Sequence, residues 1–216
     1  MKKRKTYSGF TKETAENLLL DAGAFFKNFN VETDDFDKAV AAGKLLGATK
    51  DGGEFSAVPE IRQIQVDGVK GKARGLDVLD AWDVYIKANV LEIKKESLAA
   101  ALCASKIDEE SNGKYDVITA KNYIDLEDYI ENITWVGTLS GSSEPVIIQI
   151  YNAINTDGLK LATKDKDQSV IAMNFSGRYD AANLDEPPFK VMYPKRATTT
   201  PPEQTDTTTT EQGEQS

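Results

Sequence analysis

The side chains best able to do chemistry in this chain are carboxylates gathered in two short stretches. IDLEDYIEN contains Asp125, Glu127, Asp128 and Glu131, and ETDDFDK contains Asp34, Asp35 and Asp37. Such groups can bind a hard cation or act as the paired carboxylates of a glycosidase. Neither stretch has the central glycine of a calcium loop, and the first has no evident partner cluster. We interpret the first as a solvated acidic loop and the second as the acidic start of a helix.

Histidine and cysteine offer little beyond this. The chain has no histidine, which excludes histidine-based triads and most catalytic zinc sites. Cys103 is the only cysteine, so it cannot form an intrachain disulfide, and in SLAAALCAS we expect it to be a buried, unreactive thiol on the apolar face of a short helix. With no base near a nucleophile, no metal-ligand set and no phosphate loop, we predict a protein that is not an enzyme and has no catalytic residue, cofactor or metal ion.

A glycine-rich stretch, DGVKGKARG, resembles a phosphate cradle only superficially. Its glycines match neither the Walker spacing nor a succession of strand, glycine turn and helix. Asp67-Gly68 is instead typical of a tight turn between strands. We predict a flexible hairpin whose basic edge carries Lys70, Lys72 and Arg74.

The charge balance argues against a protein that grips a nucleic-acid backbone. There are 26 basic and 35 acidic residues, and the net charge is −9. No apolar run approaches the ~20 residues that span a bilayer. The basic start MKKRK is followed by TYSGFTKETAEN rather than by a hydrophobic signal region. We therefore expect a soluble, cytosolic product without membrane insertion.

The elements that must position these residues are mainly strands, because the dominant hydrophobic period is two. Residues 81–91 place Trp82, Val84, Ile86, Ala88 and Val90 on one face. The other face carries Asp83, Tyr85, Lys87 and Asn89. This alternation predicts a half-buried strand.

Three further strands follow from the same test. Residues 131–141 place Ile133, Trp135 and Leu139 opposite Thr134, Thr138 and Ser140. Residues 168–179 place Ile171, Met173, Phe175 and Tyr179 opposite Asn174, Ser176 and Arg178. Residues 145–153 are apolar on both faces apart from Gln149, which favours a central strand. Both tryptophans, Trp82 and Trp135, are expected to pack in the core.

Helical periodicity is limited to residues 94–102 and, more weakly, residues 34–43. The sequence thus predicts a mostly-β domain, a sandwich or barrel with one or two short helices, over residues 14–196. A basic segment, residues 1–13, precedes it. The Thr/Pro-rich acidic stretch at residues 197–216 lacks large apolar residues and is predicted to be disordered.

Three stretches carry a resemblance to a known family. They are NLLLDAGAFFKNF, the segment from GKLLGATK through VPEIRQIQVDGVKGKARGLDVLDAWDVYIKANVLEI to SLAAAL, and the segment from NITWVGTLSGSSEPVIIQIYNA to NLDEPPFKVMYP. In this order, from about Thr14 to Pro194, the sequence resembles the major tail protein, or tail tube protein, of long-tailed bacteriophages and prophages of Gram-positive hosts. Residues 197–216 lie outside the resemblance.

The resemblance implies a β-sandwich or barrel-like tail-tube domain that assembles into hexameric rings. The rings stack into a tube whose lumen conducts DNA, and an acidic wall would repel the phosphate backbone and let DNA slide. It also implies tape-measure and tail-tip proteins as partners, assembly in the host cytoplasm and a final location in the virion tail. Asp83, Tyr85, Lys87 and Asn89 become candidates for the lumen or an interface, and Lys70, Lys72 and Arg74 for contacts between rings.

Two alternatives stay open. A phage adhesin or decoration module would use residues 197–216 as a display linker, and we would expect an exposed aromatic patch or long loops. A carbohydrate-active enzyme would use the acidic loops, and it should lose activity when one acid of a pair is changed.

Overall fold

The structure, a computed structural model, describes residues 7–109, 113–163 and 165–195. Strands make up 41% of it and helices 10%, and the strands pair in antiparallel sheets. The predicted mostly-β domain with one or two short helices is confirmed at this level, and the described residues contain two helices. The stretch predicted to be disordered, residues 197–216, lies outside the described residues.

The two helices are α1 (Phe36–Ala41) and α2 (Lys95–Ala101), and short 3-10 turns occur at η1 (Thr14–Glu16) and η2 (Leu126–Asp128). The strands are β1 (Ala24–Lys27), β2 (Thr49–Gln63), β3 (Asp77–Val90), β4 (Ser105–Asp108), β5 (Val117–Ala120), β6 (Ile130–Gly137), β7 (Val146–Asn155), β8 (Leu161–Ala162), β9 (Val170–Ser176) and β10 (Phe189–Met192). Both predicted helices and all four predicted strands are present, although β6 ends four residues earlier than expected.

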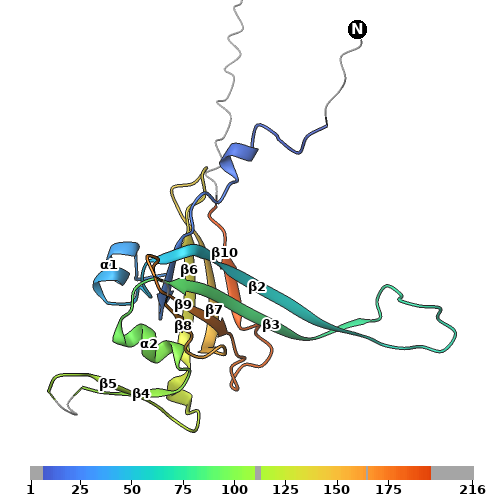
Figure 1. Cartoon of the computed structure of the whole chain (residues 1–216). Helices are drawn as coiled ribbons and strands as arrows, with labels where there is room; N and C mark the ends of the chain where they lie inside the picture. Colours follow the sequence, from blue (N-terminus) through green and yellow to red (C-terminus); the bar gives the residue numbers. More distant parts are fainter. Residues whose placement is uncertain (1–6, 110–112, 164, 196–216) are drawn as a thin grey trace, which may run out of the picture.

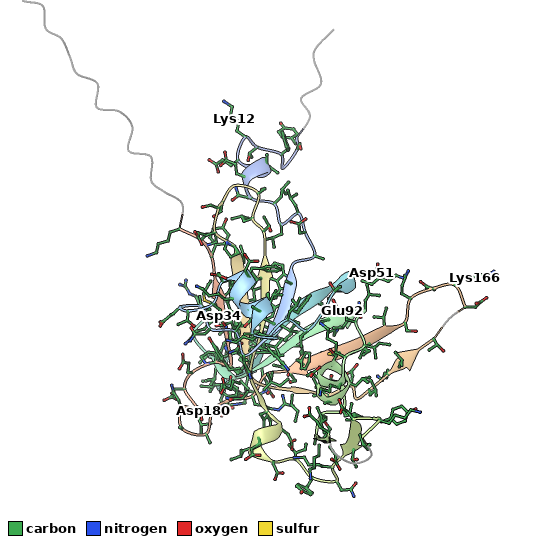
Figure 2. All side chains as sticks on the ribbon, turned by 90° about the vertical axis from the view of Figure 1, so that its left-hand side faces the viewer. Lys12, Asp34, Asp51, Glu92, Lys166 and Asp180 are labelled. Atoms are coloured by element: carbon green, nitrogen blue, oxygen red, sulfur yellow. The ribbon has the colours of Figure 1, made fainter. Side chains whose placement is uncertain are left out.

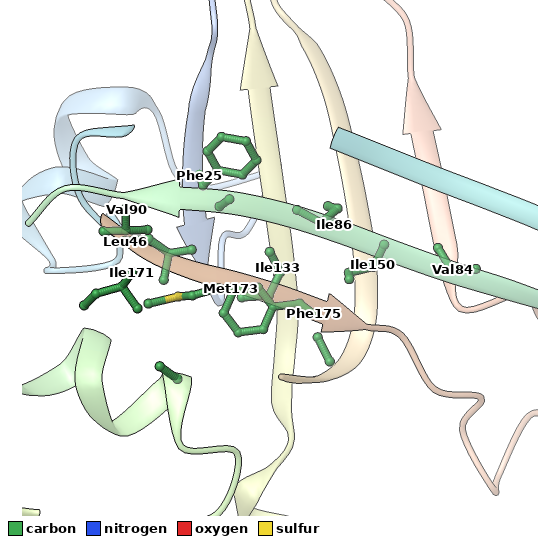
Figure 3. Close-up of a cluster of buried hydrophobic side chains, with 13 residues drawn as sticks. Phe25, Leu46, Val84, Ile86, Val90, Ile133, Ile150, Ile171, Met173 and Phe175 are labelled. Atoms are coloured by element: carbon green, nitrogen blue, oxygen red, sulfur yellow. The ribbon is translucent and has the colours of Figure 1, made fainter. Parts of the chain in front are cut away.

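The main sheet folds into two layers that are joined through β7. The first part of β7 pairs with β6 on one side and with β10 on the other. Together with β1, which pairs with β6, these strands form the first layer. The last two residues of β7, Ile154 and Asn155, pair with β9 and so lead into a second layer of β2, β3, β9 and β8. Asn152, just before this change, has a φ of 47°. Strands of the two layers cross one another (Figures 1 and 3).

The core lies between the layers and is built from the predicted apolar faces. From β3 come Val84, Ile86, Ala88 and Val90; from β9 Ile171, Met173 and Phe175; and from the first layer Phe25, Ile133 and Ile150 (Figure 3). Both tryptophans pack against this cluster as predicted. Helix α2 also contributes to it, through Leu98 and Ala101.

The outer face of the first layer is also covered, which the sequence did not predict. Phe26 and Phe29 form a second apolar cluster there with Ala39 of α1. Asp35 begins that helix as its N-cap, since its carboxylate accepts a hydrogen bond from Lys38 N at 2.8 Å. The part of the first layer beneath α1 is therefore covered on both sides, while the outer face of the second layer carries polar side chains.

Thr134 shows the consequence of this cover. We expected it on the polar side of its strand, but it is fully buried. Gln149 of β7 is buried beside it and donates to Thr134 Oγ1 at 2.8 Å and to Phe29 O at 2.9 Å. Hydrogen bonds within this face offset the cost of removing the two polar groups from water. The central position predicted for residues 145–153 is confirmed, because β7 has neighbours on both sides.

Candidate assembly surfaces

The β2–β3 hairpin extends well beyond the rest of the sheet. β2 and β3 pair from Thr49↔Val90 to Gln63↔Asp77, whereas β9 pairs with β3 only from Tyr85 to Val90. The far end of the hairpin therefore has no strand partner outside itself among the described residues. We call residues 58–81 the arm, and Figure 1 shows it projecting from the two-layered body.

The arm carries apolar side chains that have nothing to cover them. Six large hydrophobic residues on it are exposed by 43% to 59%: Val58, Ile61, Ile64, Val66, Val69 and Leu79. A two-stranded ribbon has no core of its own and is marginally stable in isolation. Apolar exposure of this kind makes the arm a candidate interaction surface.

Internal contacts nevertheless keep the arm ordered. Arg62 donates two hydrogen bonds to the carboxylate of Asp80 across the hairpin, from Nε at 2.9 Å and from Nη2 at 3.1 Å. At the start of the loop, Ile64 N donates to Leu76 O at 2.8 Å. A bidentate pair of this geometry holds the two strands in register.

The basic residues predicted on the hairpin lie in its loop, at the outer end of the arm. Lys70, Lys72 and Arg74 are all exposed, and none forms an ion pair with another described residue. The predicted turn at Asp67-Gly68 is present: Val69 N donates to Val66 O at 3.2 Å, and Gly68 has a φ of 86°. Three unpaired cations and several uncovered apolar groups thus occupy one loop.

Asp83, Tyr85, Lys87 and Asn89 share the outer face of β3 as predicted, opposite the buried Val84 and Ile86. Tyr85 donates from its hydroxyl to Asp83 Oδ2 at 2.5 Å, and this hydrogen bond raises the pKa of the phenol. Asn89 is half-buried near the end of the strand. The face is polar throughout and carries charges of both signs.

Lys87 connects this face to its neighbouring strands. Its Nζ lies 3.1 Å from Glu54 Oε2 on β2, and its register partner on β9 is Asn174. Asn174 in turn donates to Asp157 Oδ1 at 3.1 Å, and this bond is the first cause of a lowered pKa at Asp157. One cation, Lys87, thus lies between two carboxylates, Glu54 and Asp157, along this row.

The acidic stretches have structural contacts. Asp125 and Asp128 form a capping box around η2, and Lys121 Nζ bridges them at 3.1 and 2.6 Å. Asp34 pairs with Lys44 at 2.5 Å. The interpretation of residues 34–43 as a helix with an acidic start is confirmed.

Cys103 was predicted to be buried on the apolar face of a helix. It is only half-buried, and it lies after the end of α2 rather than on the helix. Its φ is 71°. Burial is the main cause of a raised pKa for its thiol, which lowers the thiolate fraction at neutral pH.

Sequence reasoning missed a groove where the first layer meets β2. Its floor includes Phe25, Phe55 and Trp135, and its edge includes Asp51, the third residue of β2, which has a φ of 61°. The available signal was the triplet Asp51-Gly52-Gly53, which is unusual inside a strand and typical of a bulge. Nothing in the alternation of residues on β1 or β6 indicated that an apolar floor would stay accessible.

Within the described residues, no helix combines the length and the apolar content that crossing a membrane requires. The same residues contain no group of three or more histidine, cysteine, aspartate or glutamate side chains placed to hold a metal ion. No protein-family model matches the chain, and no curated protein matches its sequence.

Proposed function

We propose that this chain is a structural subunit of a phage tail tube: copies of it form hexameric rings, and the rings stack into a conduit for DNA. The observation that carries the proposal is the arm. It exposes apolar side chains along its length and three unpaired cations at its end. The surface of another protein molecule would bury the apolar side chains and provide carboxylates for the cations.

The open strand edge supports self-association. β2 is 15 residues long and pairs with β3 alone, so its other edge has no strand partner among the described residues. An exposed edge of this length invites pairing with another chain. In a closed ring each such edge meets the next subunit, which removes the unpaired backbone groups from solvent.

The outer face of β3 suits the wall of a DNA conduit. Asp83 and Lys87 are exposed on it, and Lys87 is already paired with Glu54. A face in which cations are matched by carboxylates cannot hold the phosphate backbone strongly, and the net charge of the chain is −9. DNA would therefore pass without tight binding. The proposal also places tape-measure and tail-tip proteins among the partners, and the assembled protein in the virion tail.

Electron microscopy of the purified full-length chain at increasing concentration, with light scattering on the same samples, tests the proposal. We expect hollow tubes or rings with sixfold end views. Since assembly proteins can require a nucleus, the sample that stays monomeric is then mixed with tail-tip proteins. Monomers that persist in that mixture at every concentration would contradict the proposed function.

A phage adhesin or decoration module is a second candidate, favoured by the β4–β5 hairpin. This hairpin lies outside the main sheet, and Tyr115 and Tyr123 beside it are exposed by 62% and 64%. Exposed tyrosines are common in binding surfaces. An adhesin should bind whole host cells or virions as a folded monomer, and charge reversal in the arm should leave that binding unchanged.

A further inference from the structure

The groove lies where the start of β2 has a bulge. The register against β3 shifts between Thr49 and Gly53, and both Asp51 and Gly52 have positive φ values, 61° and 66°. Gly53 then passes directly over the ring of Phe25, where an added Cβ would lie 2.4 Å from Phe25 Cζ. The strand is therefore held close to the floor at this point.

The lining of the groove is mainly apolar. Phe55, Trp135 and Ile148 contribute partly exposed side chains to it, Phe25 and Ile86 lie at its base with 2% and 0% exposure, and its volume is about 410 Å³. At about 30 Å³ per water molecule, this space would hold roughly a dozen waters against apolar walls. Their release favours an occupant with apolar side chains.

The rim of the groove is acidic, and its charges are only partly neutralised. Asp21, Asp51 and Glu54 belong to the lining, and Figure 2 shows Asp51 at the surface near the start of β2. Glu54 pairs with Lys87, whereas neither Asp21 nor Asp51 forms an ion pair with another described residue. An apolar occupant flanked by cations would match both the floor and the rim.

The loop of the arm has this combination. Val66 and Val69 are exposed by 48% and 43%, and Lys70, Lys72 and Arg74 follow within a few residues with no acidic partner. We propose that the groove receives the arm loop of a second copy of this chain, with its valines on the apolar floor and its cations against Asp21 and Asp51. The inference rests on the proposed self-assembly and names the two surfaces that make one contact within it.

The loop cannot occupy the groove of its own chain. Phe55 of β2 lies in the groove, and Ile64, nine residues further on, directly follows the end of this strand. At about 3.3 Å per residue they are separated by roughly 30 Å. The Arg62–Asp80 pair holds the hairpin between them in register, so the partner must be another molecule.

Loop and groove are different surfaces, so the contact is heterologous. Each copy offers one loop and one groove, and every copy that is bound still offers a free surface to the next. Such a contact produces closed rings or extended stacks rather than isolated symmetric dimers.

The test uses a peptide of residues 61–79 and the fluorescence of Trp135. Ile61 and Leu79 are register partners on β2 and β3, so cysteines at these two ends of the peptide close it with a disulfide. The full-length protein carries Trp82→Phe, which leaves Trp135 in the groove as its only tryptophan. The peptide contains no tryptophan or tyrosine, so the emission reports on the groove alone.

We expect the native peptide to change the Trp135 emission saturably. A peptide with Lys70→Glu, Lys72→Glu and Arg74→Glu should bind with an affinity lower by a factor of at least about ten. Protein with Asp21→Lys and Asp51→Lys should bind the glutamate-substituted peptide more tightly than the native peptide. A cooperative melting transition confirms that this variant is folded. The proposal would be overturned if the native peptide caused no saturable change in Trp135 emission. It would also be overturned if protein with Asp21 and Asp51 intact bound both peptides equally well.

The outcome is separable from that of the proposed function. Tubes of the full-length chain without peptide binding would reject the groove as the receptor and leave the tail-tube proposal standing. Peptide binding by a chain that never forms tubes or rings would reject the tail-tube proposal and retain the contact.

Discussion

Asn155 Nδ2 lies 2.7 Å from the carbonyl oxygen of Ala101, a hydrogen bond that joins the end of β7 to α2. The other end of the same amide accepts a hydrogen bond from Asn174 N at 2.8 Å, which ties β7 to β9. Asn155 is 1% exposed and lies at the point where β7 leaves the first layer for the second. One buried side chain thus connects both layers and the helix that packs at their junction.

We predict that Asn155→Leu lowers the free energy of unfolding by roughly 2–4 kcal/mol, because it leaves the buried carbonyl of Ala101 and the half-buried N–H of Asn174 without these partners. Urea denaturation measures the change. Asn89→Leu is the matched control, since Asn89 is half-buried on the outer face of β3 and should lose less than about 1 kcal/mol. Equal losses in both variants would show that the Asn155 bonds contribute little.

Gly53→Ala tests the close approach of β2 to the core. A Cβ at this position would lie 2.3 Å from Lys87 O and 2.4 Å from Phe25 Cζ, so backbone or a buried ring must move. We predict a loss of roughly 1–3 kcal/mol in unfolding free energy, measured by thermal or urea denaturation. Gly9→Ala is the control, because a Cβ there meets no atom within 4 Å.

Alternation of apolar and polar residues predicts strands best where one face of the strand packs on the core and the other faces solvent. Residues 81–91 became most of β3 because Val84 and Ile86 face the core while Asp83 and Lys87 face outward, so the period of two survives in the sequence. The two short helices were also recoverable, since Asp35 at the start of α1 is a recognisable N-cap.

The missed features depend on contacts between distant segments. Thr134 is buried because α1 and Phe29, roughly a hundred residues away in the chain, cover its side of the sheet. The passage of β7 from one layer to the other has no local signal beyond Asn152, whose positive φ an asparagine tolerates. The groove likewise requires β1, β2 and β6 to meet, and no single strand encodes it.

The Lys121–Asp128 pair predicts a defined response to acid. Its hydrogen bond lowers the pKa of Asp128 below its value in the unfolded chain, although burial opposes this. A carboxylate with a depressed folded pKa stabilises the fold above its unfolded pKa, and this stability is lost as the pH falls through the folded value. We predict that Asp128→Asn unfolds more easily than the wild type at pH 7, and that the difference shrinks below about pH 4.

Urea titrations of both proteins between pH 7 and pH 2 measure this difference. Glu127→Gln is the adjacent control: its side chain is exposed and forms no ion pair among the described residues, so its unfolding free energy at pH 7 should equal that of the wild type. A difference between Asp128→Asn and wild type that stays constant down to pH 2 would mean that the ionised carboxylate is not the source of the stability.

Reversal of the arm charges separates folding from assembly. Lys70, Lys72 and Arg74 contact no described carboxylate, so changing all three to glutamate should leave the monomer folded, with a cost within about 0.5 kcal/mol per substitution. The same change places like charges against an acidic partner surface, and we predict that tubes or rings no longer form in electron microscopy. Lys106→Glu with Lys166→Glu is the control, because both lysines are exposed and lie away from the arm, and it should assemble normally. Normal tubes from the arm variant would remove these three residues from the assembly contact, and failure of both variants would attribute the effect to net charge instead.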